Sequence, residues 1–508
     1  MMMHPGLPAA WVETVLLAVL LLTAWVLRTP GYHAHSTPTI SLANLPGMGS
    51  MVRAIVSQPW IQLALRLIMV GFFIMIIVSG LFGTPVPERN AATVLTWTLW
   101  WTGLIIAVYF TGSAWCAICP WDALATWLVR RRWWKRGNAS SSMNLRVPKW
   151  MRSIWPALWM FVGLTWLELG VGITTNPYAT ALLAMLILVL TTASLAIFER
   201  KAFCRYFCSI GRTIGMYAEL SPVAVRPVDY DICANCKTLE CYHGTDEIEP
   251  CPTHLVMGRI KQNTYCTSCG ACSQSCPYQN VAWRLRPTGT EAIRDVRPHW
   301  DAAWFILGLL SLTSFHGITM MPFWEQWVRS LAVVINDSGQ LLTSFSIGMF
   351  VSMLVPVALY AGLIQIAYRI VGNSTEYKRL FSSLAITMLP LAFTYHIAHN
   401  LNHLLRESRG LSGVIFNPLG QGTLPLSVAE THFRHMNPLL SENVIFTLQA
   451  GLMLAGFWLA VRIMRSRITR LSADSLIQRM ISIPVLFFLS SVTLFNLWLL
   501  MQPMIMRM

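Results

Sequence analysis

Long apolar runs and shorter polar segments alternate along this chain. Ten runs are mainly apolar, and each has close to the ~20 residues that a membrane-spanning helix needs. One polar segment, 199–300, is much longer than the rest and divides the runs into five and five. The pattern predicts an all-α polytopic membrane protein with about ten transmembrane helices and one inserted small domain. The runs are 11–27, 60–83, 92–112, 153–174, 178–198, 301–323, 343–371, 380–403, 442–464 and 480–502.

Three domains follow from this division. We expect an N-terminal membrane domain over 1–198, an inserted domain over 199–300 and a C-terminal membrane domain over 301–508. No Lys or Arg precedes the first run, so we expect an uncleaved helix there and no signal peptide. The connector 28–58 is rich in Pro, Gly and Ser and predicts a loop, which would contain His33 and His35.

Composition and charge agree with a membrane location. Only 12% of the 508 residues are charged, against about 25% in soluble proteins. The net charge of +15 comes largely from basic residues after the third, fifth, seventh and ninth runs, which share one side if the helices alternate. The positive-inside rule makes that side the cytoplasm. We therefore expect the inserted domain in the cytoplasm, both chain ends outside, and no nucleic-acid partner.

Twelve cysteines fall between residues 116 and 276, a clustering that indicates cofactor ligation. The last four are spaced C-x2-C-x2-C-x3-C with a proline after them, the pattern of a bacterial ferredoxin [4Fe–4S] site. Four earlier cysteines form a similar run with wider gaps. In two-cluster ferredoxins the fourth cysteine of each run ligates the other cluster, so we predict two clusters with crossed ligands. The first would take Cys233, Cys236, Cys241 and Cys276, and the second Cys266, Cys269, Cys272 and Cys251.

Structural zinc and disulfides are the simpler alternatives for these eight cysteines. Zinc sites usually combine two C-x2-C pairs across a longer gap, and a C-x2-C-x2-C row suits one tetrahedral ion poorly. Disulfides need an oxidising compartment, which the expected cytoplasmic position argues against. The spacing therefore favours iron–sulfur clusters.

Two further cysteine pairs lie at predicted membrane edges. Cys116 and Cys119 follow the third run, and Cys204 and Cys208 follow the fifth. Both pairs are expected at the cytoplasmic surface beside the inserted domain. Four thiols at one depth can hold a third cluster or a metal, or act as a redox dithiol. The simpler alternative is a set of inert thiols at helix ends.

The C-terminal half carries histidines inside apolar runs. His396, His399 and His403 share one helical face, and His316 lies at a depth similar to that of His396 on another helix. Polar side chains inside a membrane are costly and usually functional. We expect either a b-type haem with two of these histidines as axial ligands, or a copper or iron site. Interhelical hydrogen bonding is the structural alternative.

The cysteine pairs and runs together resemble the NapH/NosR/FixG group of membrane polyferredoxins. The resemblance covers about 90–290, and the group's membrane motif is usually C-x3-C-P. Cys204 and Cys208 keep that spacing with Ser209 in place of the proline, whereas Cys116 and Cys119 keep Pro120 but stand one residue closer. The resemblance implies electron transfer across or along the inner membrane toward an envelope acceptor. A branch that accompanies periplasmic iron or copper uptake is also similar.

The sequence thus predicts a bacterial inner-membrane electron conduit. A cytoplasmic donor would reduce two [4Fe–4S] clusters, and a periplasmic redox protein or metal ion would be the acceptor. One alternative is a reductase or handling protein for copper or iron, and another is an iron–sulfur redox sensor. The clusters and the histidines would lie a membrane apart, so an intermediate centre is expected, but the sequence identifies none. The 22 tryptophans are interpreted as ordinary interfacial residues.

Overall fold

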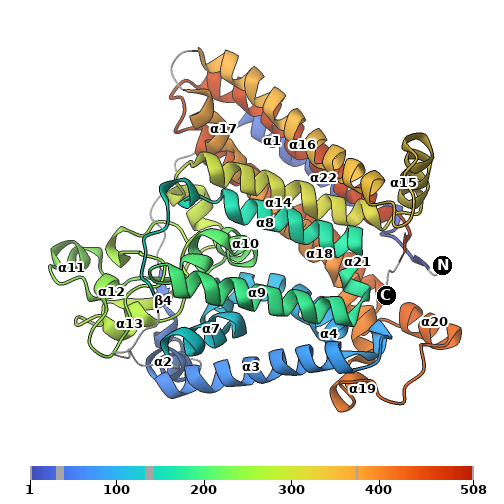
Figure 1. The fold of residues 1–508 in the computed structure, drawn as a ribbon. Helices are drawn as coiled ribbons and strands as arrows, with labels where there is room; N and C mark the ends of the chain where they lie inside the picture. Colours follow the sequence, from blue (N-terminus) through green and yellow to red (C-terminus); the bar gives the residue numbers. More distant parts are fainter. Residues whose placement is uncertain (1–2, 30–38, 48, 132–141, 373–375, 506–508) are drawn as a thin grey trace.

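The computed structural model describes residues 3–29, 39–47, 49–131, 142–372 and 376–505, and these are mainly helical (Figure 1). His33, His35 and part of the basic loop after the third run lie outside these ranges. Within them, nine helices are long and apolar enough to cross a membrane, and a tenth apolar helix, Trp155–Val171, is shorter. The prediction of an all-α, multi-pass membrane architecture is confirmed.

All ten predicted runs fall on helical segments. Their bounds are α1 (Ala9–Arg28), α3 (Pro59–Phe82), the segment Ala91–Thr111 that contains α4 and α5, α8 (Trp155–Trp166) with its extension to Val171, α9 (Pro177–Ile197), α14 (Trp300–Thr319), α16 (Leu342–Val371), the segment Tyr377–Phe416 that contains α17, α18 and α19, α21 (Glu442–Ile468) and α22 (Ser475–Met501).

Two segments outside the ten apolar runs also contain helices. The connector 28–58 includes α2 (Gly49–Ser57), and the stretch between the eighth and ninth runs includes α20 (Val428–Met436). Both helices are short and amphipathic, so their apolar residues form a stripe that a search for long apolar runs misses. The run 301–323 also divides, because α15 (Pro322–Ile335) begins at a proline in its first turn.

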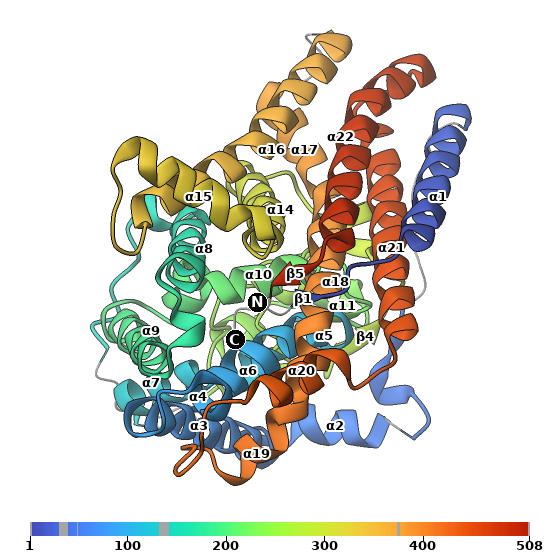
Figure 2. The same cartoon turned by 90° about the vertical axis from the view of Figure 1, so that its right-hand side faces the viewer.

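The first helix joins the C-terminal half of the membrane body. Helix α1 packs against α21 and α22 (Figure 2). Strand β1 (Met3–His4) pairs antiparallel with β5 (Met504–Ile505), so the two chain ends meet at one side of the body. The eighth run, α18 (Leu389–Glu407), is almost wholly buried among α14, α21 and α5.

The polar segment forms a small lobe at one end of the helices (Figure 1). We call residues 221–297 the inserted lobe. Strands β3 (Val223–Pro227) and β4 (Val281–Leu285) pair antiparallel, and β2 (Ile40–Ser41) from the connector adds a third strand. Between β3 and β4 lie α11 (Tyr230–Asn235), α12 (Glu240–His243) and α13 (Ala271–Ser275). Helix α10 (Ser209–Tyr217) lies between this lobe and the membrane helices.

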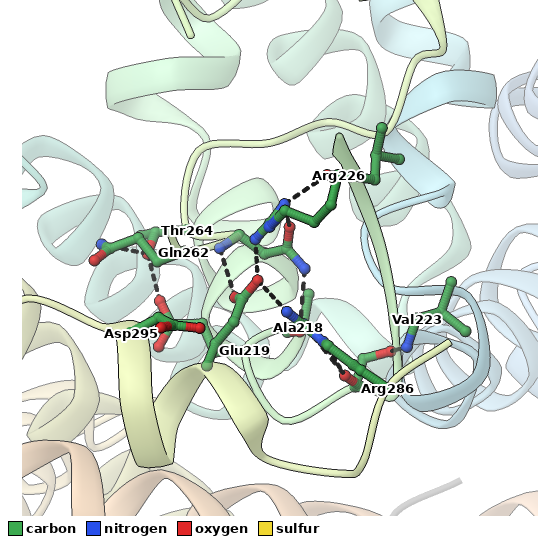
Figure 3. Close-up of polar contacts among 12 residues, drawn as sticks. Ala218, Glu219, Val223, Arg226, Gln262, Thr264, Arg286 and Asp295 are labelled. Atoms are coloured by element: carbon green, nitrogen blue, oxygen red, sulfur yellow. Dashed lines mark hydrogen bonds and ion pairs between the residues drawn. The ribbon is translucent and has the colours of Figure 1, made fainter. Parts of the chain in front are cut away.

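A buried ionic network orders the part of the lobe that meets the membrane body (Figure 3). Glu291 accepts hydrogen bonds from Arg226 and from Arg286, the latter at 2.5 Å. Buried charges are tolerated when they are paired and hydrogen-bonded, so this network holds the lobe together. Arg467 of α21 donates to the carbonyl oxygens of residues 292 and 296, and these bonds fix the lobe against α21.

Candidate functional site

The structure gathers four lobe cysteines around one cavity of about 390 Å³. They come from α11, α12 and the segment after α13, and we call them the first cysteine group: Cys233, Cys236, Cys241 and Cys276. Asn280 is buried and donates from Nδ2 to Cys233 Sγ and from its backbone N–H to Cys276 Sγ, both at 3.4 Å. At Gly258 a Cβ atom would lie 2.7 Å from Cys233 Cβ, so glycine permits this close approach.

The other four lobe cysteines form a second cysteine group: Cys251, Cys266, Cys269 and Cys272. Burial raises the pKa of the Cys266 thiol to about 11; the charge of Arg226 opposes the rise, and the charges of Cys269 and Cys251 contribute to it. Burial likewise raises the pKa of Cys272, with contributions from the other three thiols of the group and then from Cys241. The second group therefore lies close to the first, and without a metal its buried thiols are protonated.

The structure also brings together the four cysteines at the membrane edge. We call Cys116, Cys119, Cys204 and Cys208 the membrane-edge group. Cys119 caps α7 (Pro120–Arg130), and Cys208 caps α10, where its sulfur accepts a hydrogen bond from Gly211 N–H at 3.2 Å. Burial raises the pKa of the Cys116 thiol to about 12, and the charge of Cys208 adds to this. The charge of Cys266 also acts on Cys116, so this group adjoins the second group.

Charged side chains surround the membrane-edge group. Arg212 is fully buried, donates to the carbonyl oxygen of Cys204 at 2.9 Å, and lies over the Tyr265 ring. Its positive charge opposes the raised pKa of Cys116 and Cys208. A reactive dithiol needs a thiol with a lowered pKa, so the raised pKa values of Cys116 and Cys208 give no support to dithiol chemistry.

No three His, Cys, Asp or Glu side chains in the described ranges converge closely enough to hold a single metal ion. A mononuclear zinc site therefore has no support among those residues. A [4Fe–4S] cube takes one thiolate on each of four irons, so its ligands need not converge on one point. The donor chemistry of both lobe groups, four soft thiolates each, suits such a cube.

The histidines are gathered in a different pairing from the one expected. His316 lies beside His399, with ring centroids 5.1 Å apart, and His399 lies 5.3 Å from His403. His396 instead shares a hydrogen bond of 3.2 Å with the Tyr217 hydroxyl and lies 5.7 Å from the Trp101 ring. Equal depth on two helices did not bring His316 and His396 together, because rotation about the helix axes also decides which faces meet.

His403 continues into a polar chain toward the C-terminal end of α18. Its Nδ1 shares a hydrogen bond of 3.1 Å with Glu407, whose other oxygen accepts one from Thr98 at 2.6 Å. Glu407 and Thr98 line a cavity together with Glu88, Thr431 and Arg434. Sequence reasoning missed Glu407 because a carboxylate at a helix end usually faces solvent.

Sequence reasoning also missed a tryptophan-lined cavity of about 650 Å³ within the membrane helices. Trp97, Trp100 and Trp101 come from the π-helix η3 (Val94–Trp101), and Trp121 comes from α7. Glu168 and Ser209, the residue after Cys208, complete the polar part of the lining. π-Helices are rare and often mark functional sites, but no sequence pattern predicts where one occurs.

Comparisons with known proteins give two partial matches. The chain is 25% identical over 155 residues to the "Putative electron transport protein YccM" of Escherichia coli K12, which is 29% of this chain and 41% of that protein. It is 28% identical over 106 residues to the "Uncharacterized protein MJ0750" of Methanocaldococcus jannaschii, which is 21% of this chain and 40% of that protein. The chain thus spans about two fifths of the length of these relatives. No family model and no solved structure matches.

Proposed function

We propose that this chain is a bacterial inner-membrane electron-transfer protein. It takes electrons from a cytoplasmic donor at the inserted lobe and passes them toward an acceptor at the outer face. The observation that carries the proposal is the sequence of three cysteine groups, each close enough to influence the next: Cys241 acts on Cys272, and Cys266 acts on Cys116. The name of the Escherichia coli relative, an electron transport protein, agrees with this class.

The lobe residues would hold two [4Fe–4S] clusters, one in each cysteine group. Bound clusters would supply one-electron carriage at low potential. Asn280 donates hydrogen bonds to two sulfurs of the first group, and such bonds set the potential of a thiolate-held centre. The membrane-edge group is the proposed site of a third cluster or metal, where Arg212 offsets the negative charge of the thiolates.

Aromatic side chains offer a path from the membrane edge to the histidines. Trp115 precedes Cys116, and its ring lies 5.5 Å from Trp100. Trp100 lies 6.0 Å from Trp101, which lies 5.7 Å from His396. Electron tunnelling slows steeply as the gap between neighbouring groups widens, so a row of rings with short gaps favours passage. We propose this row as the tunnelling medium between the membrane-edge group and the histidines.

For the outer acceptor we propose two candidates. The intramembrane histidines are the proposed ligands of a haem or of a copper or iron centre that passes electrons to a periplasmic protein. Alternatively, a metal ion is itself reduced. Glu88 and Glu407 line a cavity next to His403 and would offer oxygen donors to such an ion, although Arg434 in the same lining opposes its charge.

Metal analysis and spectra of the full chain test the proposal. The protein is purified anaerobically in detergent, and its visible and EPR spectra are recorded before and after reduction. We expect iron and sulfide in equal amounts and a cluster EPR signal on reduction. Sharp haem bands would support a histidine-held haem, whereas copper without haem would support metal reduction. Zinc without iron would overturn the proposed function.

A further inference from the structure

The inserted lobe exposes apolar side chains away from the lipid-facing helices. Most exposed large apolar residues lie on the spanning helices, where lipid covers them. Val228, Tyr230, Ile232 and Tyr278 are different, because they belong to the lobe and are 51%, 50%, 38% and 56% exposed. Figure 1 shows α11 at the end of the lobe, far from α16 and α22. We call these four residues the lobe patch. An exposed apolar cluster on a soluble surface often marks a contact with another protein.

The lobe patch adjoins the first cysteine group. Ile232 and Tyr278 line the same cavity as the four cysteines of that group. Asn280 holds the two sides of the patch together, since its side chain donates to Asp229 O and its backbone carbonyl accepts from Val228 N–H at 2.8 Å. A protein that covers this patch therefore comes close to the first cysteine group.

The charge around the patch is opposite to the charge of the chain. Segment 229–249 contains six acidic residues and one lysine, whereas the whole chain has a net charge of +15. Asp229 and Asp231 are exposed and alternate with the patch residues along the sequence, and Glu240 lines the cavity. Two cations accompany these acidic residues: Lys237 of the same segment is exposed, and Arg284 of β4 donates to the Val228 carbonyl oxygen at 2.8 Å. An acidic surface selects a partner with basic residues around its contact face.

We propose that the lobe patch is the docking site of the soluble electron donor, a redox protein whose own electron exit has an apolar centre and a basic rim. This inference rests on the proposed function and names the class of its donor. Apolar contact supplies the attraction at short range, and Asp229, Asp231 and Glu240 guide the encounter.

Basic cytochrome c serves as the probe. Reduced full-length protein, freed of excess reductant, is mixed anaerobically with ferric cytochrome c, and each turnover moves one electron from the protein to the ferric haem iron. Asp231→Lys is compared with Glu376→Lys, which makes the same charge change at the exposed start of α17, well apart from α11 in both views (Figures 1 and 2). Tyr230→Ser removes apolar surface from the patch.

We expect Asp231→Lys to slow the reaction about tenfold at low salt, and the difference to vanish near 1 M salt, where charges are screened. Glu376→Lys should leave the rate nearly unchanged, and Tyr230→Ser should weaken binding of ferrous cytochrome c in titration calorimetry. The proposed docking site would be overturned if Asp231→Lys and Glu376→Lys reduced cytochrome c at equal rates. It would also be overturned if Tyr230→Ser bound ferrous cytochrome c as the wild type does. Cluster EPR signals in the same samples decide the proposed function separately, and the calorimetry tests docking even where those signals are absent.

Discussion

The hydroxyl of Tyr217 and Nδ1 of His396 share a hydrogen bond of 3.2 Å in the buried centre of the molecule. Tyr217 ends α10, whose first residue follows Cys208, while His396 belongs to α18. One short helix of about 13 Å thus contacts the membrane-edge group at one end and the histidines at the other. A displacement of α10 at one end would therefore also move the residues at its other end.

Replacement of Cys269 by alanine tests the lobe assignment. We expect about eight irons per wild-type chain, or about twelve if the membrane-edge group binds a third cluster, and loss of about four in Cys269→Ala. Iron analysis and EPR of the reduced protein measure this. Ser273→Ala, four residues along the same lobe, should keep the wild-type iron content. An unchanged EPR spectrum in Cys269→Ala would contradict the assignment.

Replacement of Cys208 by serine tests the membrane-edge group without disturbing α10. Serine is a favoured helix N-cap, so its oxygen can accept the Gly211 N–H bond that the sulfur now accepts. We expect the iron content to fall by about four in Cys208→Ser if a third cluster is present, while the lobe EPR signal persists. If the wild type and the variant contained the same amount of iron per chain, the role of these cysteines would instead be structural.

The pH dependence of stability tests the buried position of Glu219. Burial raises the pKa of this carboxyl from 4.5 to about 8, although Thr264 and the charges of Arg467 and Arg286 oppose the rise. The folded state therefore holds more protons than the unfolded state between these values, and its stability falls as pH rises through that window.

Glu219→Gln should remove this loss. Above pH 8 we expect the variant to unfold at a higher temperature than the wild type, because its free energy of unfolding is larger by on the order of 1 kcal/mol or more. We expect this difference in stability to shrink toward pH 4.5. Thermal unfolding in detergent across this pH range measures it. Asp246→Asn, which removes an exposed carboxyl, should follow the wild-type curve. Parallel curves for Glu219→Gln and the wild type would refute the raised pKa.

Replacement of His396 by alanine tests the histidine end of the route. The change breaks the bond to Tyr217 and removes the ring next to Trp101, so we expect slower delivery of electrons to an outer acceptor and altered bands of any bound haem. Stopped-flow oxidation of the reduced protein in proteoliposomes, with a periplasmic-side acceptor, records the rate. His432→Ala on α20, where the histidine is exposed, is the matched control. Unchanged spectra and rates in His396→Ala would leave the histidines with a structural role.

Hydropathy carried most of what the sequence predicted correctly. A run of about 20 apolar residues has few alternatives to a spanning helix, because lipid leaves no backbone polar group unpaired. Amphipathic helices such as α2 and α20 lack that length and were assigned to loops. The cysteine spacing named the candidate ligands, and whether they bind clusters remains a prediction.

The sequence did not predict which faces of the helices contact one another. His316 meets His399 because of the rotation of α14 against α18, which no single-helix pattern records. The same holds for the hydrogen bond from Thr98 to Glu407, which joins η3 to α18. The pair His403–Glu407, by contrast, is an i,i+4 pair on one helix, a spacing that the sequence does record. The tryptophans of η3 were interpreted as interfacial residues. Their gathering around one cavity depends on a local change from α-helix to π-helix, which the sequence did not predict.

The π-helical segment Val94–Trp101 winds more widely than the α-helices on either side of it. An α-helix turns by about 100° per residue and a π-helix by less, so the segment holds about one more residue than α-helical winding would over the same rotation. Deletion of one residue within it would therefore restore ordinary winding and leave α5 in its present orientation relative to α4. The change would be confined to the indole rings of that turn, so it would alter the row of rings without altering the packing of α5 or insertion into the membrane.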